Sequence, residues 1–146
     1  MFKNLLVPIS GDALTKAELK TAIKLAKADG AKITLAYVSD PIIPYSSSEI
    51  QSVLALSEKE YKKHCELFAA NLFTKAKKLI GSEIKVEQIH ISHPNVSDGI
   101  IEAAKNAKAD VIAMSSHKRT GIKGIFLRSE AHEVILHSNI PVLILN

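Results

Sequence analysis

The stretch DVIAMSSHKRTGIKGIFLRSEAHEVILHS, residues 110–138, predicts a strand, a loop and a helix in direct succession. DVIAM (110–114) is a short apolar run typical of a buried strand, and SEAHEVILHS (129–138) is typical of a helix with Ser129 at its start. In α/β proteins, the junction between a strand and the N-terminus of the next helix commonly holds phosphates. Loops of this kind usually have glycines where the backbone touches the ligand, so the residues at 115–129 decide whether a nucleotide is held there.

The rest of the chain alternates strands and helices in the same way. Strands are predicted at 4–9, 32–38, 83–91, 110–114 and 140–145, and helices at 14–29, at 48–80, within 93–109 and at 129–138. This alternation predicts a single doubly wound α/β domain over residues 1–146, with a five-stranded parallel sheet and helices on both faces. The runs 4–9 and 110–114 are the most uniformly apolar, which indicates central strands. If they are neighbours, the strand order reverses between them, and ligands bind at their C-terminal ends.

The apolar spacing predicts which side of each helix is buried. In the predicted strand at residues 83–91, apolar and polar residues alternate imperfectly, which favours a place at the edge of the sheet. The expected buried positions are Leu19, Ala22, Ile23 and Ala26 in the first helix, Tyr61, Cys65, Phe68, Leu72, Ala76 and Leu79 in the second, and Val96, Ile100, Ala103, Ala104 and Ala107 in the third.

Composition narrows the class of protein. The chain has a formal charge of +4, 47% hydrophobic residues and one cysteine, Cys65, so no internal disulfide can form. No apolar run is long enough to span a membrane, and the start MFKNLLVPIS lacks a secretory pattern, so we expect a cytoplasmic protein without membrane contact. Lysines are spread along the chain with carboxylates among them, which favours solvated helix faces over a nucleic-acid surface.

Four segments together resemble the universal stress protein family. They are LLVPIS, KLAKADGAKITLAYV, ISHPNVSDGIIEAAKNAKADVIAMSSHKRTGI and SEAHEVILHSNIPVLIL, and the likeness covers essentially the whole chain. The resemblance implies strand order 3-2-1-4-5 and a homodimer whose interface lies near the last strand. It therefore places Val142, Leu143 and Ile144 at or near a dimer interface.

The nucleotide-binding branch of that family carries a Gly-x2-Gly-x9-Gly-Ser/Thr pattern after the fourth strand. Laid on this sequence, its glycine positions fall on Ser115, Lys118 and Arg128, while Ser129 matches the final hydroxyl. The acidic residue common after the first strand corresponds to Ser10, and the glycine before the proline ahead of the third helix corresponds to Ser92. The resemblance implies a degenerate nucleotide site made of Pro8, Ser10, Val38, Met114, Ser115, His117, Lys118, Arg128 and Ser129, in which Val38 keeps the residue that packs against adenine.

Two interpretations of this loop stay open. Glycine allows positive φ and close approach of a backbone N–H to phosphate, whereas Lys118 and Arg128 place long side chains there, which argues against tight ATP binding. Alternatively, these cations could hold phosphate through their side chains, with Ser129 capping the helix, although Glu130 would repel it. His90 and His93 lack the further ligands that a metal site needs, so no metal is expected.

The sequence contains no nucleophile–base pair and no paired acids, so we expect no enzymatic activity. The leading hypothesis is a homodimeric stress protein that acts through contacts with an unknown protein partner and has no required cofactor. The alternative is a ligand-gated switch that binds ATP or AMP, and an ATP-hydrolysing or phosphate-transferring enzyme has the least support. The segment 39–60, with two prolines and a serine run, is predicted to be mobile and to lie over the mouth of the crevice.

Overall fold

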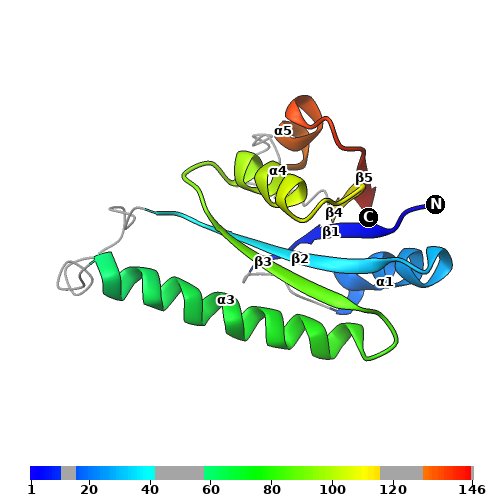
Figure 1. The fold of residues 1–146 in the computed structure, drawn as a ribbon, viewed down its shortest axis with the longest axis horizontal. Helices are drawn as coiled ribbons and strands as arrows, with labels where there is room; N and C mark the ends of the chain where they lie inside the picture. The colour runs from blue at the N-terminus through cyan, green and yellow to red at the C-terminus, as the bar shows by residue number, and fades with distance from the viewer. Residues whose placement is uncertain (11–15, 42–57, 116–129, 146) are drawn as a thin grey trace, which may run out of the picture.

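The computed structural model describes residues 1–10, 16–41, 58–115 and 130–145 (Figure 1). The strands are β1 (Asn4–Pro8), β2 (Lys32–Ser39), β3 (Val86–Ser92), β4 (Val111–Ser115) and β5 (Val142–Leu145). The helices are α1 (Lys16–Asp29), α3 (Glu58–Ile80), α4 (Val96–Asn106) and α5 (Glu130–His137). The predicted alternation of strands and helices is confirmed throughout this part of the chain.

All five strands are parallel, and their order is β3-β2-β1-β4-β5. The predicted sheet order is therefore confirmed, as is the central place of β1 and β4. The order reverses between these two strands, so the crevice between parallel-strand ends that commonly binds ligands lies beside them. The imperfectly alternating strand β3 is at one edge of the sheet, as predicted, and β5 is at the other.

Alternate residues of each strand contribute their side chains to two separate hydrophobic cores. On one face, residues such as Leu5 and Ile33 pack with α1 and α3. On the other face, residues such as Leu6 and Ile112 pack with α4 and α5. The two-residue repeat of a strand causes this division, and Figure 1 shows the helix pairs on opposite sides of the sheet.

Some sequence-based details differ from the structure. The buried stripe of α3 consists of Ala69, Leu72, Phe73, Ala76 and Ile80. Phe68, predicted to be buried, is 42% exposed, and Val96, at the first position of α4, is 39% exposed. Both predictions were based on the apolar character of these residues along their helices. The buried sector of α3 is shifted by one residue from the predicted one, and Val96, in the first turn of α4, extends beyond the sheet. Similarly, the buried side chain of Ile84 lies in the turn before β3, so the strand begins later than predicted.

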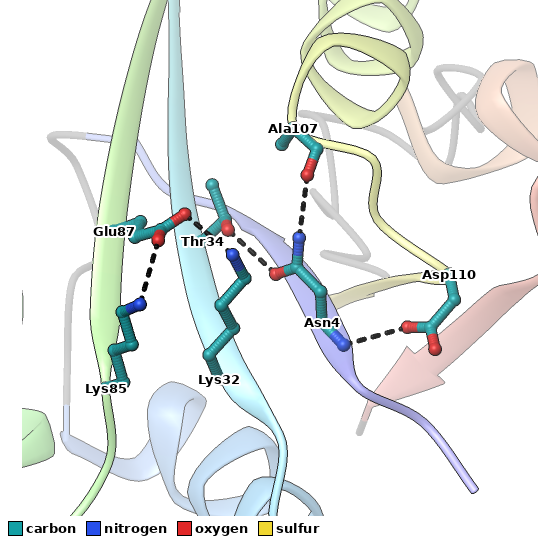
Figure 2. Close-up of polar contacts among 7 residues, drawn as sticks. All are labelled: Asn4, Lys32, Thr34, Lys85, Glu87, Ala107 and Asp110. Carbon is teal, nitrogen blue, oxygen red and sulfur yellow. Dashed lines mark hydrogen bonds and ion pairs between the residues drawn. The ribbon is translucent and has the colours of Figure 1, made fainter.

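A partly buried polar network joins three segments at the amino-terminal edge of the sheet (Figure 2). The Asn4 side chain donates from Nδ2 to the Ala107 carbonyl oxygen at 2.9 Å, and its Oδ1 accepts from Thr34 Oγ1 at 2.8 Å. The Asp110 carboxylate accepts from the backbone N–H of Asn4 at 3.0 Å and of Lys3 at 2.7 Å. We call Asn4, Thr34, Ala107 and Asp110 the amino-edge network. It connects β1 to β2 and to the turn between α4 and β4.

The chain start is fixed by a second polar contact. The Asp29 carboxylate accepts from the Phe2 N–H at 2.8 Å and lies 3.5 Å from the Met1 amino group. The hydrogen bond from Phe2, with the positive N-terminus, lowers the pKa of Asp29 below its usual range.

Among the helices described, none is both long and apolar enough to cross a membrane.

Candidate functional site

The carboxyl-terminal ends of β1, β2 and β4 bring five predicted site residues to one edge of the sheet. Pro8 ends β1 opposite Ala36 of β2, and Ser115 ends β4 opposite Leu145 of β5. Val38 is the penultimate residue of β2, Met114 precedes Ser115, and Ser10 is exposed just after β1. These five residues thus lie at the same edge of the sheet, beside the point where the strand order reverses. His117, Lys118, Arg128 and Ser129 lie outside the described residues, as does the part of the predicted mobile segment that covers 42–57.

Ser115 occupies the first glycine position of the nucleotide-binding pattern, and its backbone is part of a regular strand. Among the described non-glycine residues, only Lys108 has a positive φ, at 53°. The conformation at Ser115 is therefore one that any residue adopts. Serine at this position instead reduces the space beside the backbone, because its Cβ and hydroxyl occupy a volume that glycine would leave open to a ligand.

The Val38 side chain packs beneath helix α4. A Cβ built on Gly99 would lie 2.6 Å from Val38 Cγ1, 3.0 Å from its Cγ2 and 3.2 Å from His93 Cβ. Gly99 is buried, so the absence of its side chain allows α4 to approach the end of β2 closely. Val38 is only half-buried and lies near the carboxyl-terminal end of β2, and the resemblance places adenine against it.

Replacing Gly99 with alanine should therefore destabilise the protein. Overpacking against Val38 costs about 1–3 kcal/mol, whereas alanine in place of a helical glycine gains about 1 kcal/mol. We expect a net loss of up to about 2 kcal/mol in the free energy of unfolding, measured by urea denaturation. Adding Val38→Ala should make the Gly99→Ala change neutral or stabilising. Equal losses from Gly99→Ala in both backgrounds would contradict this assignment of the clash.

A hollow of about 280 Å³ lies between the first turns of α4 and α5. It is lined by Pro94, Asn95, Val96, Ser97, Glu130 and Glu133. Asn95 caps α4, since its Oδ1 accepts from the Asp98 N–H at 3.1 Å and from Ser97 Oγ at 2.7 Å. Glu130 is the first residue of α5, as predicted, and its carboxylate, with that of Glu133, makes this hollow unfavourable for an anion. Sequence reasoning missed the hollow because its two walls are more than thirty residues apart.

The two histidines near the end of β3 have separate partners. His90 Nε2 lies 2.8 Å from Ser39 Oγ, and the His90 ring is 5.5 Å from that of Tyr37. Burial lowers the pKa of His90, although the charge of Glu66 acts in the opposite direction. His93 Nδ1 accepts from the Asn95 N–H at 3.0 Å. Within the described ranges, no three side chains of His, Cys, Asp or Glu are grouped so that they could hold a metal ion.

A mixed aromatic and polar cluster covers the neighbouring end of β2. The Tyr37 ring lies 5.5 Å from that of Phe68, and Tyr61 donates its hydroxyl to the Asp40 carbonyl oxygen at 2.9 Å. Burial is the main cause that raises the pKa of Tyr61 to about 12. Tyr61 is therefore a neutral hydrogen-bond donor at physiological pH, and it attaches the first half of α3 to the end of β2.

Comparison with known proteins identifies the relatives of this chain. The pattern of the Universal stress protein family matches residues 1–146. A universal stress protein of Methanocaldococcus jannaschii is 28% identical over 99% of this chain and 82% of its own length. The solved structure of the hypothetical protein MJ0577 is 30% identical to this chain and superposes with a TM-score of 0.69. The match covers 99% of this chain and 96% of MJ0577.

Two solved neighbours contain adenine nucleotides. A universal stress protein in complex with cAMP is 22% identical, with a TM-score of 0.63, over 99% of this chain and 97% of its own. The universal stress protein from Archaeoglobus fulgidus in complex with dAMP is 16% identical, with a TM-score of 0.56, over 99% and 98%. At these sequence identities, the likeness to the two complexes supports only the assignment of the fold to this chain. Together with the full-length family match and the 3-2-1-4-5 sheet, it leads to one conclusion: the chain belongs to the universal stress protein family.

Proposed function

We propose that this protein works as a homodimer in the cytoplasm, responds to stress through contacts with other proteins, and does not bind ATP tightly. The observation that carries the proposal is the place of Ser115 at the crevice. It ends a regular strand, so its side chain stands where the nucleotide-binding pattern has a glycine. The sequence replaces the other two glycines of the pattern with Lys118 and Arg128.

The expected loss of affinity follows from the number of these changes. Each 1.4 kcal/mol of lost binding energy weakens a complex about tenfold. Three blocked backbone contacts of roughly that size would weaken ATP binding about a thousandfold. No catalytic turnover is part of the proposal, because the sequence suggests no nucleophile–base pair.

A second candidate function is an adenine-nucleotide switch. The cAMP and dAMP complexes of its structural neighbours favour it, and so does the convergence of Pro8, Val38 and Met114 at one edge. In that case, Lys118 and Arg128 would hold phosphate through their side chains.

A thermal-shift titration with ATP, ADP and AMP, with and without Mg²⁺, separates the two functions. A ligand at a concentration equal to its Kd stabilises a protein by only about 0.4 kcal/mol, so a Kd of about 1 mM gives almost no shift at lower concentrations. We expect no saturable shift below about 1 mM nucleotide. A saturable shift at micromolar ATP or AMP would replace the main proposal with the switch, and release of phosphate from ATP would show an enzyme.

The proposed dimer uses the edge strand β5. Val142, Leu143 and Ile144 are only half-buried, and β4 is the neighbouring strand of β5 in the sheet. On the adjoining helix α5, Ile135 is 50% exposed and Leu136 is 58% exposed. A short apolar edge of this kind promotes aggregation unless something covers it, and a second copy of the chain would cover it.

Replacing Val142 with lysine should weaken the dimer at least about tenfold, because a charge would have to be buried with the strand edge. Light scattering over a concentration series measures the change. Thr74→Lys, which adds the same charge on the exposed side of α3, is the matched control and should leave the dimer intact. A natural protein that is monomeric at micromolar concentration would exclude the dimer.

A further inference from the structure

Helix α1 carries a stripe of lysines along its exposed surface. Lys20, Lys24 and Lys27 follow one another at spacings of four and three residues, so they lie on one side of the helix. All three are exposed, and Leu19, Ala22 and Ala26 occupy the buried side. The stripe spans about 10 Å along the helix axis, since each residue adds about 1.5 Å.

Helix α3 continues this positive surface. It packs beside α1 on the same face of the sheet, as Figure 1 shows, and Lys75 and Lys78 are exposed in its second half. Lys27 Nζ lies 2.8 Å from Glu83 Oε2, and Glu83 follows shortly after the end of α3. The Lys27 end of the lysine stripe therefore lies near the end of α3. We call Lys20, Lys24, Lys27, Lys75 and Lys78 the basic face.

Few negative charges compensate the basic face. In the part of the chain that the structure describes, Glu83 is the one carboxylate that pairs with any of these lysines. The acidic residues of α3 are Glu58, Glu60 and Glu66, all in its first half, and α4 and α5 carry Asp98, Glu102, Glu130 and Glu133 on the other side of the sheet. Helix α1 itself contains Glu18 and Asp29, and Asp29 pairs with the Met1 amino group. The basic face therefore has a local excess of positive charge.

This local excess of positive charge is unfavourable for the isolated protein. Like charges four residues apart on a helix, such as Lys20 and Lys24, destabilise the helix slightly. An anionic partner would remove that repulsion, and complementary charges would increase the rate and specificity of its binding. The basic face thus has the electrostatic character of a docking surface.

We propose that the basic face binds an acidic segment of a protein partner, namely a helix with carboxylates at spacings of three and four residues. The inference rests on the proposed function, since it assigns the chemistry of the protein partner. The spacing of the stripe on α1 matches that of such a helix laid alongside it. Helix α1 and the second half of α3 contain no arginine, and their one aromatic side chain, Phe73, is buried, so this surface lacks the groups that read base edges or stack on bases. A protein carboxylate therefore fits it better than a nucleic acid does.

The test measures binding of a fluorescein-labelled helical peptide of alanine with glutamates at these spacings, by fluorescence anisotropy at low salt. The triple variant Lys20→Glu, Lys24→Glu, Lys75→Glu should bind it at least about fivefold more weakly than the natural protein. The matched control is Lys59→Glu, Lys62→Glu, Lys63→Glu, which changes the net charge equally at exposed positions in the first half of α3. It should lose less than about twofold. A second triple variant with glutamine at positions 20, 24 and 75 should also bind more weakly, and its melting temperature reports whether the fold is intact.

Equal losses in the two glutamate variants would show that net charge alone attracts the peptide, and would overturn the proposal. Tighter binding of a mixed-sequence DNA duplex or of phosphatidylglycerol vesicles than of the peptide would also overturn it, in favour of that other class of partner. Light scattering and nucleotide titration of the same variants report separately on the dimer and the crevice. A failure of the basic face is therefore distinguishable from a failure of the proposed function.

Discussion

Replacing Asn4 with leucine should lower the free energy of unfolding by about 2–6 kcal/mol, because it leaves one buried and one partly buried polar group without partners at a cost of about 1–3 kcal/mol each. Thr34 Oγ1 would lose its acceptor and the Ala107 carbonyl oxygen its donor. Asn4 and Thr34 are only 4% and 2% exposed, so water cannot easily replace these bonds. Urea denaturation measures the change.

A double-mutant cycle tests whether the amino-edge network is the cause. Thr34→Val alone should cost about 1–2 kcal/mol, since it leaves Asn4 Oδ1 without its donor. Once Asn4 is leucine, the same Thr34 change should cost clearly less, because the bond it removes is already gone. Glu87→Gln, which breaks exposed ion pairs with Lys32 and Lys85 nearby, should hardly change the unfolding midpoint. Strict additivity of the two network changes would show that Asn4 and Thr34 act independently.

The second large effect is expected at the crevice. The combined change Ser115→Gly, Lys118→Gly, Arg128→Gly and Ser10→Asp returns the nucleotide-binding pattern and keeps Val38 and Ser129. We expect the natural protein to show no ATP binding below about 1 mM, equivalent to about −4 kcal/mol, and the quadruple variant to bind at least about tenfold more tightly. Isothermal titration calorimetry measures both. Glycine at position 115 weakens the end of β4 by about 0.5–1 kcal/mol, so the folded fraction of the variant must be checked by circular dichroism.

The single change Arg128→Gly separates the two interpretations of the loop. If lost backbone access is the cause of weak binding, this change leaves binding weak or improves it slightly. If the natural protein instead binds ATP at micromolar concentration and Arg128→Gly abolishes binding, the cations hold the phosphate. The ligand-gated switch would then be the correct function.

The sequence predicted features that depend on local repeats. Alternation of apolar runs was enough to predict five parallel strands and the central position of β1 and β4, because a buried parallel strand must be apolar on both faces. The edge position of β3 followed from its mixed pattern. Pro8, Val38 and Met114 were predicted from the family resemblance, and the parallel strands place them at one edge of the sheet.

Features that join distant parts of the chain could not be predicted in this way. Asn4 looks like the polar start of an apolar strand until Thr34 and Asp110 are placed beside it, thirty and 106 residues away. Charge behaves similarly, since the lysines of α1 and those of the second half of α3 are brought together only by the packing of the two helices. Exposure of Phe68 depends on how far α3 extends past the sheet, which helical periodicity does not specify. The candidate residues at 117, 118, 128 and 129 stay predictions, because the described residues do not include them.

The amino-edge network lies at the end of the sheet opposite the crevice, and this distance matters for the evolution of such a protein. Mutations that remove glycines from a ligand loop leave the bonds of Asn4 untouched, so selection for a stable scaffold does not oppose them. A lineage can therefore lose a ligand, and later regain one, while it inherits the same fold. Resistance to heat would then be a poor guide to which descendants still recognise a nucleotide.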